Sequence, residues 1–334
     1  MSIVPHNRPT LGPEEAAAAN AAIASGWVAQ GPKVAAFEDD LCRFLGLPEG
    51  HAVAVSSGSA ALFLALWALG ARGQAVACPV YACSALPNAI RLAGGTPIFV
   101  DVDDGPNVSA AALAVTGAFI GIAAHMFGLP QKLGRDNGIR LIEDCAQAIG
   151  ARCEGAAVGT QGDIGIFSFY ATKMMTTGGQ GGALVSRDWA LVDAVRDYRQ
   201  FDCREDKKPR FNFQMTDPQA AVGSVQLGRL PQFLARRQTL FAAYRAAGID
   251  LMESSQGAAR YRAVTCVTEP DRVLAHLKEA GISAIIPIQD WELLDTPNAF
   301  EHAHALSRKA ISLPLYPSLT DDEQKRVIAA LADA

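Results

Sequence analysis

The sequence lacks the excess of basic residues that nucleic-acid-binding proteins carry. Among its 334 residues, 29 are Lys or Arg and 34 are Asp or Glu, so the formal net charge is −5. No run of Lys and Arg is interleaved with aromatic residues. Because a negative net charge provides no field that gathers phosphate backbones, we expect no nucleic acid as a partner.

Long uninterrupted hydrophobic runs are also missing. Residues 52–71 and 105–131 contain no Asp, Glu, Lys or Arg, but the first segment includes SSGS and the second includes Pro106, Asn107 and His125. Neither offers the roughly 20 apolar residues of a membrane span, so we expect no membrane contact. The start, MSIVPHNRPT, has no basic region followed by an apolar one, and we expect no secretory signal.

Two further motifs are absent. No CxxC pair occurs, and the number of cysteines is odd, which favours reduced thiols in the cytoplasm over a disulfide framework or a zinc site. No GxGxxG follows a first strand, which argues against a nicotinamide-dependent sugar enzyme. The seven cysteines stand at positions 42, 78, 83, 145, 153, 203 and 266.

What the sequence does contain is a series of short apolar runs separated by helical stretches. The runs are continuous rather than alternating, which is typical of strands buried on both faces in a mostly parallel sheet covered by helices. This pattern predicts an α/β domain with a seven-stranded sheet. The candidate strands are residues 52–55, 75–80, 96–102, 118–124, 139–144, 164–169 and 182–186.

The chain is long enough for a large domain and a smaller one. Residues 59–71 are apolar almost all round, which predicts a helix buried within the large domain, and residues 12–27 read as an amphipathic helix. A later helical stretch is predicted to be interrupted at Pro231, because proline removes a helical hydrogen bond. We therefore expect a large α/β domain over residues 1–230 and a small α+β domain over residues 231–334.

Three segments should meet where an open α/β sheet binds ligands, beyond the carboxyl ends of its strands. In the first, VSSGSAAL (residues 55–62), a strand ends and a helix begins. Free amides at a helix N-terminus bind phosphate, and glycine lets the backbone approach closely. The alternative is an ordinary helix cap.

The second segment, IRLIEDCAQAIGA, places Asp144 and Gln147 directly after a strand. A carboxylate there could bind a ribose, a metal or a protonated ring nitrogen, or it could cap a helix. No cluster of His and carboxylates with metal-ligand spacing accompanies it, so we predict no metal site.

The third segment, FSFYATKMMTTGGQGG, places Lys173 four residues after a predicted strand, between Ser168 and four glycines. Most lysines are solvated surface residues. A lysine at the end of a buried strand is partly desolvated, and it can act as an amine nucleophile. Together, a phosphate cup, a carboxylate and a lysine beyond three strands describe a pyridoxal phosphate site.

Many motifs of the sequence, in order, resemble those of the DegT/DnrJ/EryC1/StrS family. Its members are pyridoxal phosphate-dependent aminotransferases of the aspartate aminotransferase fold (type I), most of which aminate keto sugars attached to nucleotides. The resemblance covers nearly the whole chain. The matching stretches include SSGSAALFLAL, GGTPIFVDVD, HMFGLP, IEDCAQAIGA, GDIGIFSFYATK, FNFQMTDPQAAVGSVQL and ISLPLYPSLT.

The resemblance implies a role for each matching residue. Lys173 would form the Schiff base with pyridoxal 5′-phosphate, Asp144 would partner its pyridine nitrogen, and Gln147 would lie near its ring hydroxyl. The family also implies a homodimer with shared active sites. The phosphate contacts would be Gly58, Ser59 and Ser168, with Asn212 contributed by the other subunit. We assign no role to His125.

Several departures from the family pattern concern the substrate side. The aromatic residue that stacks on the cofactor aligns with Cys83, while Tyr81 lies two residues earlier, and either side chain could cover the ring. Gln214 replaces an arginine, and residues 281–291 lack the family's usual histidine. The chain is also shorter than typical members.

These features predict a ping-pong aminotransferase that moves an amino group from L-glutamate, through the pyridoxamine form, to a keto sugar. One alternative is a pyridoxamine-dependent sugar dehydratase, in which histidine occupies the position of Lys173. Another is a regulatory or binding protein that holds the cofactor without turnover. Motifs place the cofactor but leave the sugar, the aminated carbon and the pathway open.

Overall fold

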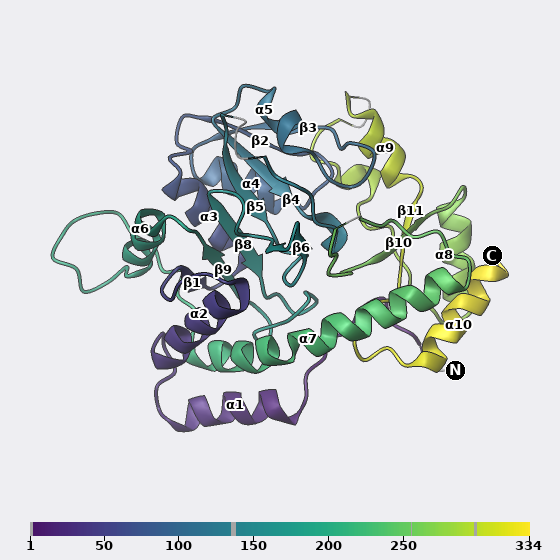
Figure 1. The fold of residues 1–334 in the computed structure, drawn as a ribbon, viewed down its shortest axis with the longest axis horizontal. Coiled ribbons are helices and arrows are strands. Elements are labelled where there is room, and N and C mark those ends of the chain that lie inside the picture. Colours follow the sequence, from purple (N-terminus) through teal and green to yellow (C-terminus); the bar gives the residue numbers. More distant parts are fainter. Residues whose placement is uncertain (1–2, 135–137, 255, 297–298) are drawn as a thin grey trace.

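The computed structural model describes residues 3–134, 138–254, 256–296 and 299–334, and a seven-stranded sheet forms its centre (Figure 1). The strand order is β1-β9-β8-β5-β4-β2-β3. All neighbouring pairs are parallel except the two that β9 makes. These strands are Ala52–Val55 (β1), Ala75–Pro79 (β2), Thr96–Val100 (β3), Ile120–Ala124 (β4), Arg140–Asp144 (β5), Ile164–Ser168 (β8) and Gly182–Val185 (β9).

Each predicted strand is confirmed, and burial on both faces explains the continuous apolar runs. In β1, Ala52 and Ala54 belong to the core on one face of the sheet, while Val53 and Val55 belong to the core on the other face. A strand with one solvated face would alternate polar and apolar residues instead. The mostly parallel α/β sheet follows from this double burial.

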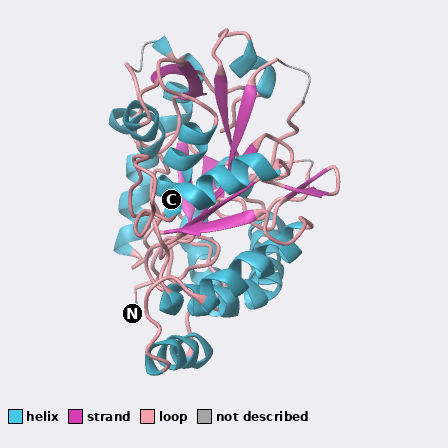
Figure 2. Cartoon of the chain, turned by 90° about the vertical axis from the view of Figure 1, so that its left-hand side faces the viewer, coloured by secondary structure: helices cyan, strands magenta, loops and turns pink. Residues whose placement is uncertain are grey.

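Helices cover both faces of the sheet (Figure 2). Helices α3 and α6 pack on the face that contains Val53 and Val55, and α2 packs with part of α7 on the other face. The helices and helical turns of this part of the chain are Pro13–Ala24 (α1), Pro32–Leu45 (α2), Gly58–Ala68 (α3), Ala85–Leu92 (α4), Ala110–Ala114 (α5), Met126–Gly128 (η1), Trp189–Arg199 (α6) and Asp217–Ala246 (α7).

The two helices predicted near the N-terminus differ in how much of their surface is buried. Helix α3 is buried over most of its surface, as predicted from its apolar composition. Helix α1 forms where expected, but its predicted amphipathic character is wrong. Its buried residues are Glu15 and Ala22, and Ile23 is 58% exposed. Because the helix is rich in alanine, its faces hardly differ in polarity.

The predicted interruption at Pro231 is also wrong, since α7 continues through the proline. Pro231 lies on the exposed side of the helix, whereas Leu230 and Phe233 are buried on the inner side. Packing on both sides of the proline thus keeps the two halves of α7 in one element despite the missing hydrogen bond.

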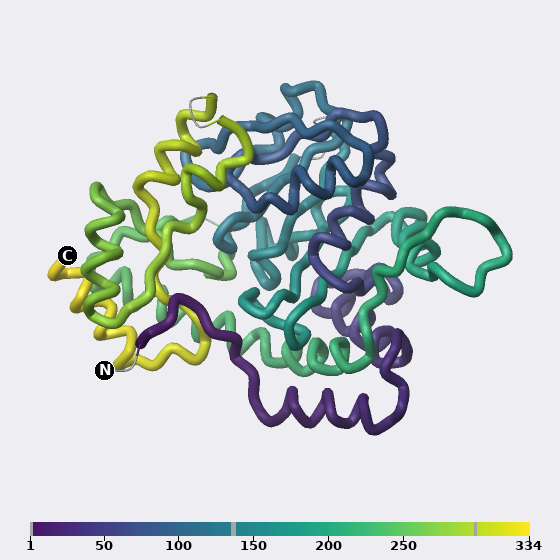
Figure 3. The backbone as a smooth tube through the Cα atoms, turned by 180° about the vertical axis from the view of Figure 1, so that it is seen from behind, coloured from purple at the N-terminus to yellow at the C-terminus, as the bar shows by residue number. Residues whose placement is uncertain are grey.

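The C-terminal part is an α+β unit, as predicted. Strands Ala263–Cys266 (β10) and Ala310–Leu313 (β11) pair antiparallel. The N-terminal segment lies beside this unit, because the amide of Val4 donates to the carbonyl of Gly281 at 2.9 Å (Figure 3). The domain boundary near residue 230 remains a prediction. The remaining elements are Arg152–Cys153 (β6), Ala156–Ala157 (β7), Pro270–Glu279 (α8), Asp290–Glu292 (η2), Glu301–Ser307 (α9) and Asp321–Ala332 (α10).

The length and the apolar character of the helices bear on the expectation that the chain has no membrane span. Within the described ranges, none of the helices combines the length and the apolar character that a bilayer crossing requires. The two uncharged segments form strands, turns and helices inside the α/β part of the chain. Residues 1–2 of the start MSIVPHNRPT lie outside the described residues.

The buried carboxylate of Asp217, at the start of α7, caps the N-terminus of α2. It accepts hydrogen bonds from the amides of Gly31 at 2.8 Å, Lys33 at 3.1 Å and Val34 at 3.1 Å. Its side chain belongs to a residue that is 1% exposed. A negative charge at a helix N-terminus is stabilised by the unpaired amides and by the helix dipole. Asp217 therefore joins two helices that are far apart in the sequence.

Replacing the carboxylate of Asp217 tests its contribution to the stability of the fold. We expect Asp217→Asn to lower the free energy of unfolding by about 1–3 kcal/mol, because an amide nitrogen would then face buried donors. Asp193→Asn on the exposed side of α6 is the matched control, for which we expect a much smaller change. Denaturant titration of the two variants at one protein concentration measures both, and equal losses would contradict the capping role.

Candidate active site

The first turn of α3 leaves two backbone amides available at the end of β1. Ser57 is the N-cap, and its side-chain oxygen accepts a hydrogen bond from the amide of Ala60 at 3.1 Å. Gly58 and Ser59 occupy the first two helical positions, where amides have no intrahelical acceptor. This turn therefore serves both as a capped helix and as a place where a phosphate can bind.

Two glycines allow neighbouring backbones to approach this turn. A Cβ at Gly182 would lie 2.4 Å from the carbonyl carbon of Ser57, and a Cβ at Gly58 would lie 2.8 Å from the Cβ of Ser168. Gly182 pairs with both Val55 of β1 and Ser168 of β8. The Ser168 side chain is thereby held beside the first turn of α3.

Asp144 ends β5, the neighbour of β8 in the sheet. One of its carboxylate oxygens accepts a hydrogen bond from the amide of Ala146 at 2.9 Å, and the residues that follow form turns rather than an α-helix. It therefore caps no helix. Burial raises the pKa of Asp144, although that hydrogen bond and the charges of Lys173 and His125 act in the opposite direction. A nearby cationic group, such as a protonated ring nitrogen, would stabilise the charged carboxylate.

Lys173 lies on a tight loop between β8 and β9. Its amide donates to the carbonyl of Tyr170 at 2.9 Å, and the amide of Ala171 donates to the carbonyl of Gly179 at 2.9 Å. Gly178 and Gly179 have φ angles of 90° and 146°, which residues with a Cβ rarely adopt. These glycines let the chain turn back, so that Lys173 is half-buried beyond the end of β8.

The ring of Tyr261 lies next to the lysine. The Nζ atom of Lys173 is 5.5 Å from the ring centroid, and Tyr261 is 5% exposed. Burial by itself would raise the pKa of Tyr261, but the positive charges of Lys173, Arg262 and Arg237 lower it below its ordinary value. Lys173 and two arginines thus surround one buried tyrosine ring.

A buried group behind Asp144 combines His125, Glu143 and Cys145, whose potential ligand atoms lie within 4.8 Å of one another. Glu143 accepts hydrogen bonds from the amides of Gly159, Gln161 and Gly162 and lies 3.1 Å from Nε2 of His125. Nδ1 of His125 accepts the amide of Gln131 at 3.3 Å, so Nε2 carries the proton that Glu143 accepts. Because the ring nitrogens of His125 and the carboxylate of Glu143 already have partners, these two residues fit a structural role.

The other predicted site residues differ in accessibility. Tyr81 has no exposed surface, and its ring packs edge-on against Phe127 with centroids 6.2 Å apart, whereas Cys83 is exposed. Gln147 uses its side-chain oxygen to accept the amide of Phe127 at 2.8 Å. Asn212 is exposed on the segment that follows the projecting loop between α6 and α7 (Figure 1). Their predicted contacts with the cofactor remain predictions.

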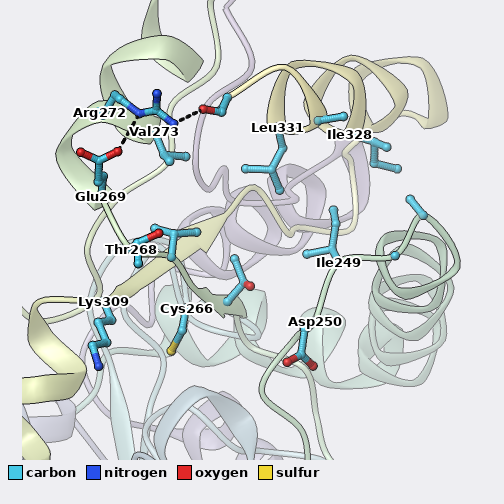
Figure 4. A pocket seen from close by; sticks show the side chains of 16 residues that line it. Ile249, Asp250, Cys266, Thr268, Glu269, Arg272, Val273, Lys309, Ile328 and Leu331 are labelled. Atoms are coloured by element: carbon cyan, nitrogen blue, oxygen red, sulfur yellow. Dashed lines mark hydrogen bonds and ion pairs between the residues drawn. The ribbon is translucent and has the colours of Figure 1, made fainter.

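A pocket of about 760 Å³ lies elsewhere, in the C-terminal unit (Figure 4). Its lining includes Ile249, Cys266 and Lys309 but none of the predicted site residues. Arg272 at its rim already bonds Glu269 and the carbonyl of Ala334. This pocket is therefore separate from the predicted site residues at the sheet edge.

Sequence reasoning missed the groups that the C-terminal part brings to Lys173. Tyr261 and Arg262 lie within an unremarkable stretch, RYRAV (residues 260–264), and the buried Arg237 belongs to a helix with several basic residues. No spacing links these positions to Lys173. The polar residues inside an otherwise apolar strand pattern were the only available signal.

Known proteins resemble this chain over nearly its full length. The spore coat polysaccharide biosynthesis protein SpsC of Bacillus subtilis (strain 168) is 30% identical in an alignment that is 382 residues long. The alignment covers 99% of this chain and 96% of SpsC. The aminotransferase TlmJ from Streptoalloteichus hindustanus is 29% identical, with a TM-score of 0.91 and 99% of each chain covered. The sugar aminotransferase Spr1654 of Streptococcus pneumoniae, solved in a PLP form, is 23% identical with a TM-score of 0.88, over 98% of this chain and 97% of Spr1654, and shows the shared fold.

The resemblance inferred from the sequence motifs is confirmed by the family comparison. The model of the DegT/DnrJ/EryC1/StrS aminotransferase family matches residues 9–332. The chain belongs to this family and is an aminotransferase.

Proposed function

We propose that this aminotransferase uses pyridoxal 5′-phosphate to move an amino group from L-glutamate to a keto sugar that is linked to a nucleotide. The observation that supports the proposal most strongly is the convergence of three groups at one edge of the sheet. The first turn of α3, the carboxylate of Asp144 and the amine of Lys173 follow β1, β5 and β8, and β9 joins β1 to β8.

The residues present fit this cofactor. The close approach at Gly58 and Gly182 packs Ser168 directly against the first turn of α3, so that the Ser168 hydroxyl and the free amides of that turn would contact the same phosphate. Asp144 is a carboxylate that burial penalises and that a protonated pyridine nitrogen would stabilise. When bound, the cofactor supplies an electron sink that stabilises negative charge on the substrate carbon.

Lys173 has two tasks in this proposal. Its amine would hold the cofactor, and its Nζ atom would take up and return a proton at the substrate carbon. Tyr261 limits where the Nζ atom can lie, because the ring is buried and only 5.5 Å away. Gln147 would hold the cofactor's ring hydroxyl with its remaining amide hydrogens.

The proposal also covers the side chain over the cofactor ring, the second subunit and the cellular location. Exposure favours Cys83 over the buried Tyr81 as the side chain that covers the ring. Asn212 would reach the phosphate of a second subunit in a homodimer, which its exposed position permits. Seven free cysteines support a cytoplasmic location.

Particular residues argue against a sugar dehydratase and against a binding protein without turnover. A sugar dehydratase of this fold would need histidine where Lys173 stands. The presence of Lys173, Asp144 and Ser168 weighs against a binding protein without turnover. The name of SpsC, a polysaccharide biosynthesis protein, supports a sugar acceptor, and we propose one of that class.

The absorbance spectrum tests the proposal directly. We expect the protein with pyridoxal phosphate to show the visible band of a lysine-bound cofactor, and L-glutamate to remove it. Lys173→Ala should not form that band, and turnover should fall by at least about 10²- to 10⁴-fold, because proton transfer loses its base. Lys325→Ala, at a side chain that is 75% exposed, is the control. A band that ignores every amino donor would refute the transaminase assignment.

The glycine contact tests the phosphate cup. Gly182→Ala should weaken pyridoxal phosphate binding by at least about tenfold, since its Cβ would lie 2.4 Å from the Ser57 backbone and displace the α3 turn. Gly228→Ala is the matched control, because no atom lies within 4 Å of the added Cβ on α7. Fluorescence titration with the cofactor gives both dissociation constants. Unchanged binding in Gly182→Ala would contradict this location of the phosphate.

A further inference from the structure

Arg262 lies close to Lys173 although 88 residues separate them in the sequence. The guanidinium carbon of Arg262 is 5.3 Å from the centroid of the Tyr261 ring, and the Nζ atom of Lys173 is 5.5 Å from the same centroid. Its amide donates to the carbonyl of Phe127 at 3.3 Å, which fixes the start of the side chain. Arg262 and Lys173 are therefore neighbours of the same aromatic ring.

Arg262 differs from the neighbouring arginine in its partners. Arg260 forms an ion pair with Glu253. Among the described residues, no carboxylate lies within 4.0 Å of Arg262, and its Nε atom is buried without a hydrogen-bond partner. A buried or half-buried cation without a counter-ion is costly, so this arrangement favours an anionic ligand.

Within the described part of the chain, one side chain bonds the Arg262 guanidinium, and it is neutral. Nη1 of Arg262 lies 3.2 Å from Nε2 of His6, which is also 2.9 Å from the hydroxyl of Ser312. Burial, followed by the charges of Arg262 and Arg237, lowers the pKa of His6 to about 3. At neutral pH His6 thus accepts a hydrogen bond from Arg262 and orients it without neutralising it.

A second arginine adds positive charge but is not itself accessible. Arg237 is 1% exposed, and its Nη1 donates to the carbonyls of Arg260, Tyr261 and Leu315 at 3.3, 3.1 and 2.8 Å. These bonds hold the segment that carries Arg262 in place. Arg237 therefore acts as a positioning residue and raises the local positive potential.

We infer that Arg262 binds a carboxylate of the amino-acid donor, an inference that rests on the proposed transamination. Lys173 works on the carbon that carries the donor's amino group, and the α-carboxylate is attached to that carbon. A guanidinium binds a carboxylate through two parallel hydrogen bonds, which fixes orientation as well as affinity. The same cation could instead bind a phosphate of the sugar nucleotide, so the experiment separates these two sources.

Glutarate and inorganic diphosphate serve as non-reacting probes of the protein reconstituted with pyridoxal phosphate. We expect Arg262→Gln to weaken glutarate binding by about 10- to 100-fold in calorimetry, the effect of losing a charged hydrogen bond. Arg262→Lys should recover part of the affinity, because the charge remains. Arg43→Gln on α2, at a side chain that is 67% exposed and paired with Asp40, is the matched control and should bind as the unmodified protein does.

The cofactor band separates this inference from the proposed function. Arg262→Gln should keep the band, and with L-glutamate its half-reaction should need a higher donor concentration while the limiting rate changes less. Unchanged glutarate binding in Arg262→Gln would overturn the inference, and so would a loss of diphosphate binding alone, which would assign Arg262 to the sugar nucleotide. A protein with no cofactor band in unmodified form would instead overturn the proposed function.

Discussion

One left-handed turn at Phe127 and Gly128 joins the parts of the chain that make the site. Their φ angles are 60° and 77°, and for a residue with a Cβ such a conformation costs about 1–2 kcal/mol. The cost is offset by what the turn binds: the amide of Phe127 meets Gln147, and its carbonyl accepts the amide of Tyr261 at 3.0 Å. A Cβ at Gly128 would lie 2.8 Å from the Tyr261 nitrogen. The turn after β4 and the C-terminal unit are thus held at a fixed distance.

The alternation of β5 assigns different tasks to two adjacent carboxylates. Glu143 faces three backbone amides and His125, and these bonds lower its pKa although burial acts to raise it. Burial raises the pKa of Asp144, whose side chain has one backbone amide as a hydrogen-bond partner. The carboxylate of Glu143 is therefore stabilised by hydrogen bonds within the protein, whereas the carboxylate of Asp144 remains available for a ligand. Because successive residues of a strand point to opposite faces, exchanging the two tasks would require a shift in register.

The sequence predicts the sheet edge better than the groups that surround it. Strands, the α3 turn, Asp144 and Lys173 are recognisable because each depends on a local pattern, an apolar run followed by small or polar residues. Arg262 and His6 are not, since their partners depend on how the C-terminal unit and the N-terminal segment pack. The interruption expected at Pro231 failed for a related reason: local propensity was outweighed by tertiary packing around Leu230 and Phe233.

Helix α7 fixes the position of Tyr261 and Arg262 relative to the sheet. At its start, Asp217 caps α2, and midway Gln226 bonds Glu15 of α1 at 2.7 Å. Beyond Pro231, Arg237 holds the carbonyl of Tyr261 at 3.1 Å. Because α7 is one continuous element, a change in its direction at Pro231 would move Tyr261 and its neighbour Arg262 relative to the sheet. The geometry between the lysine and the arginine therefore depends on the course of α7 as well as on the sheet.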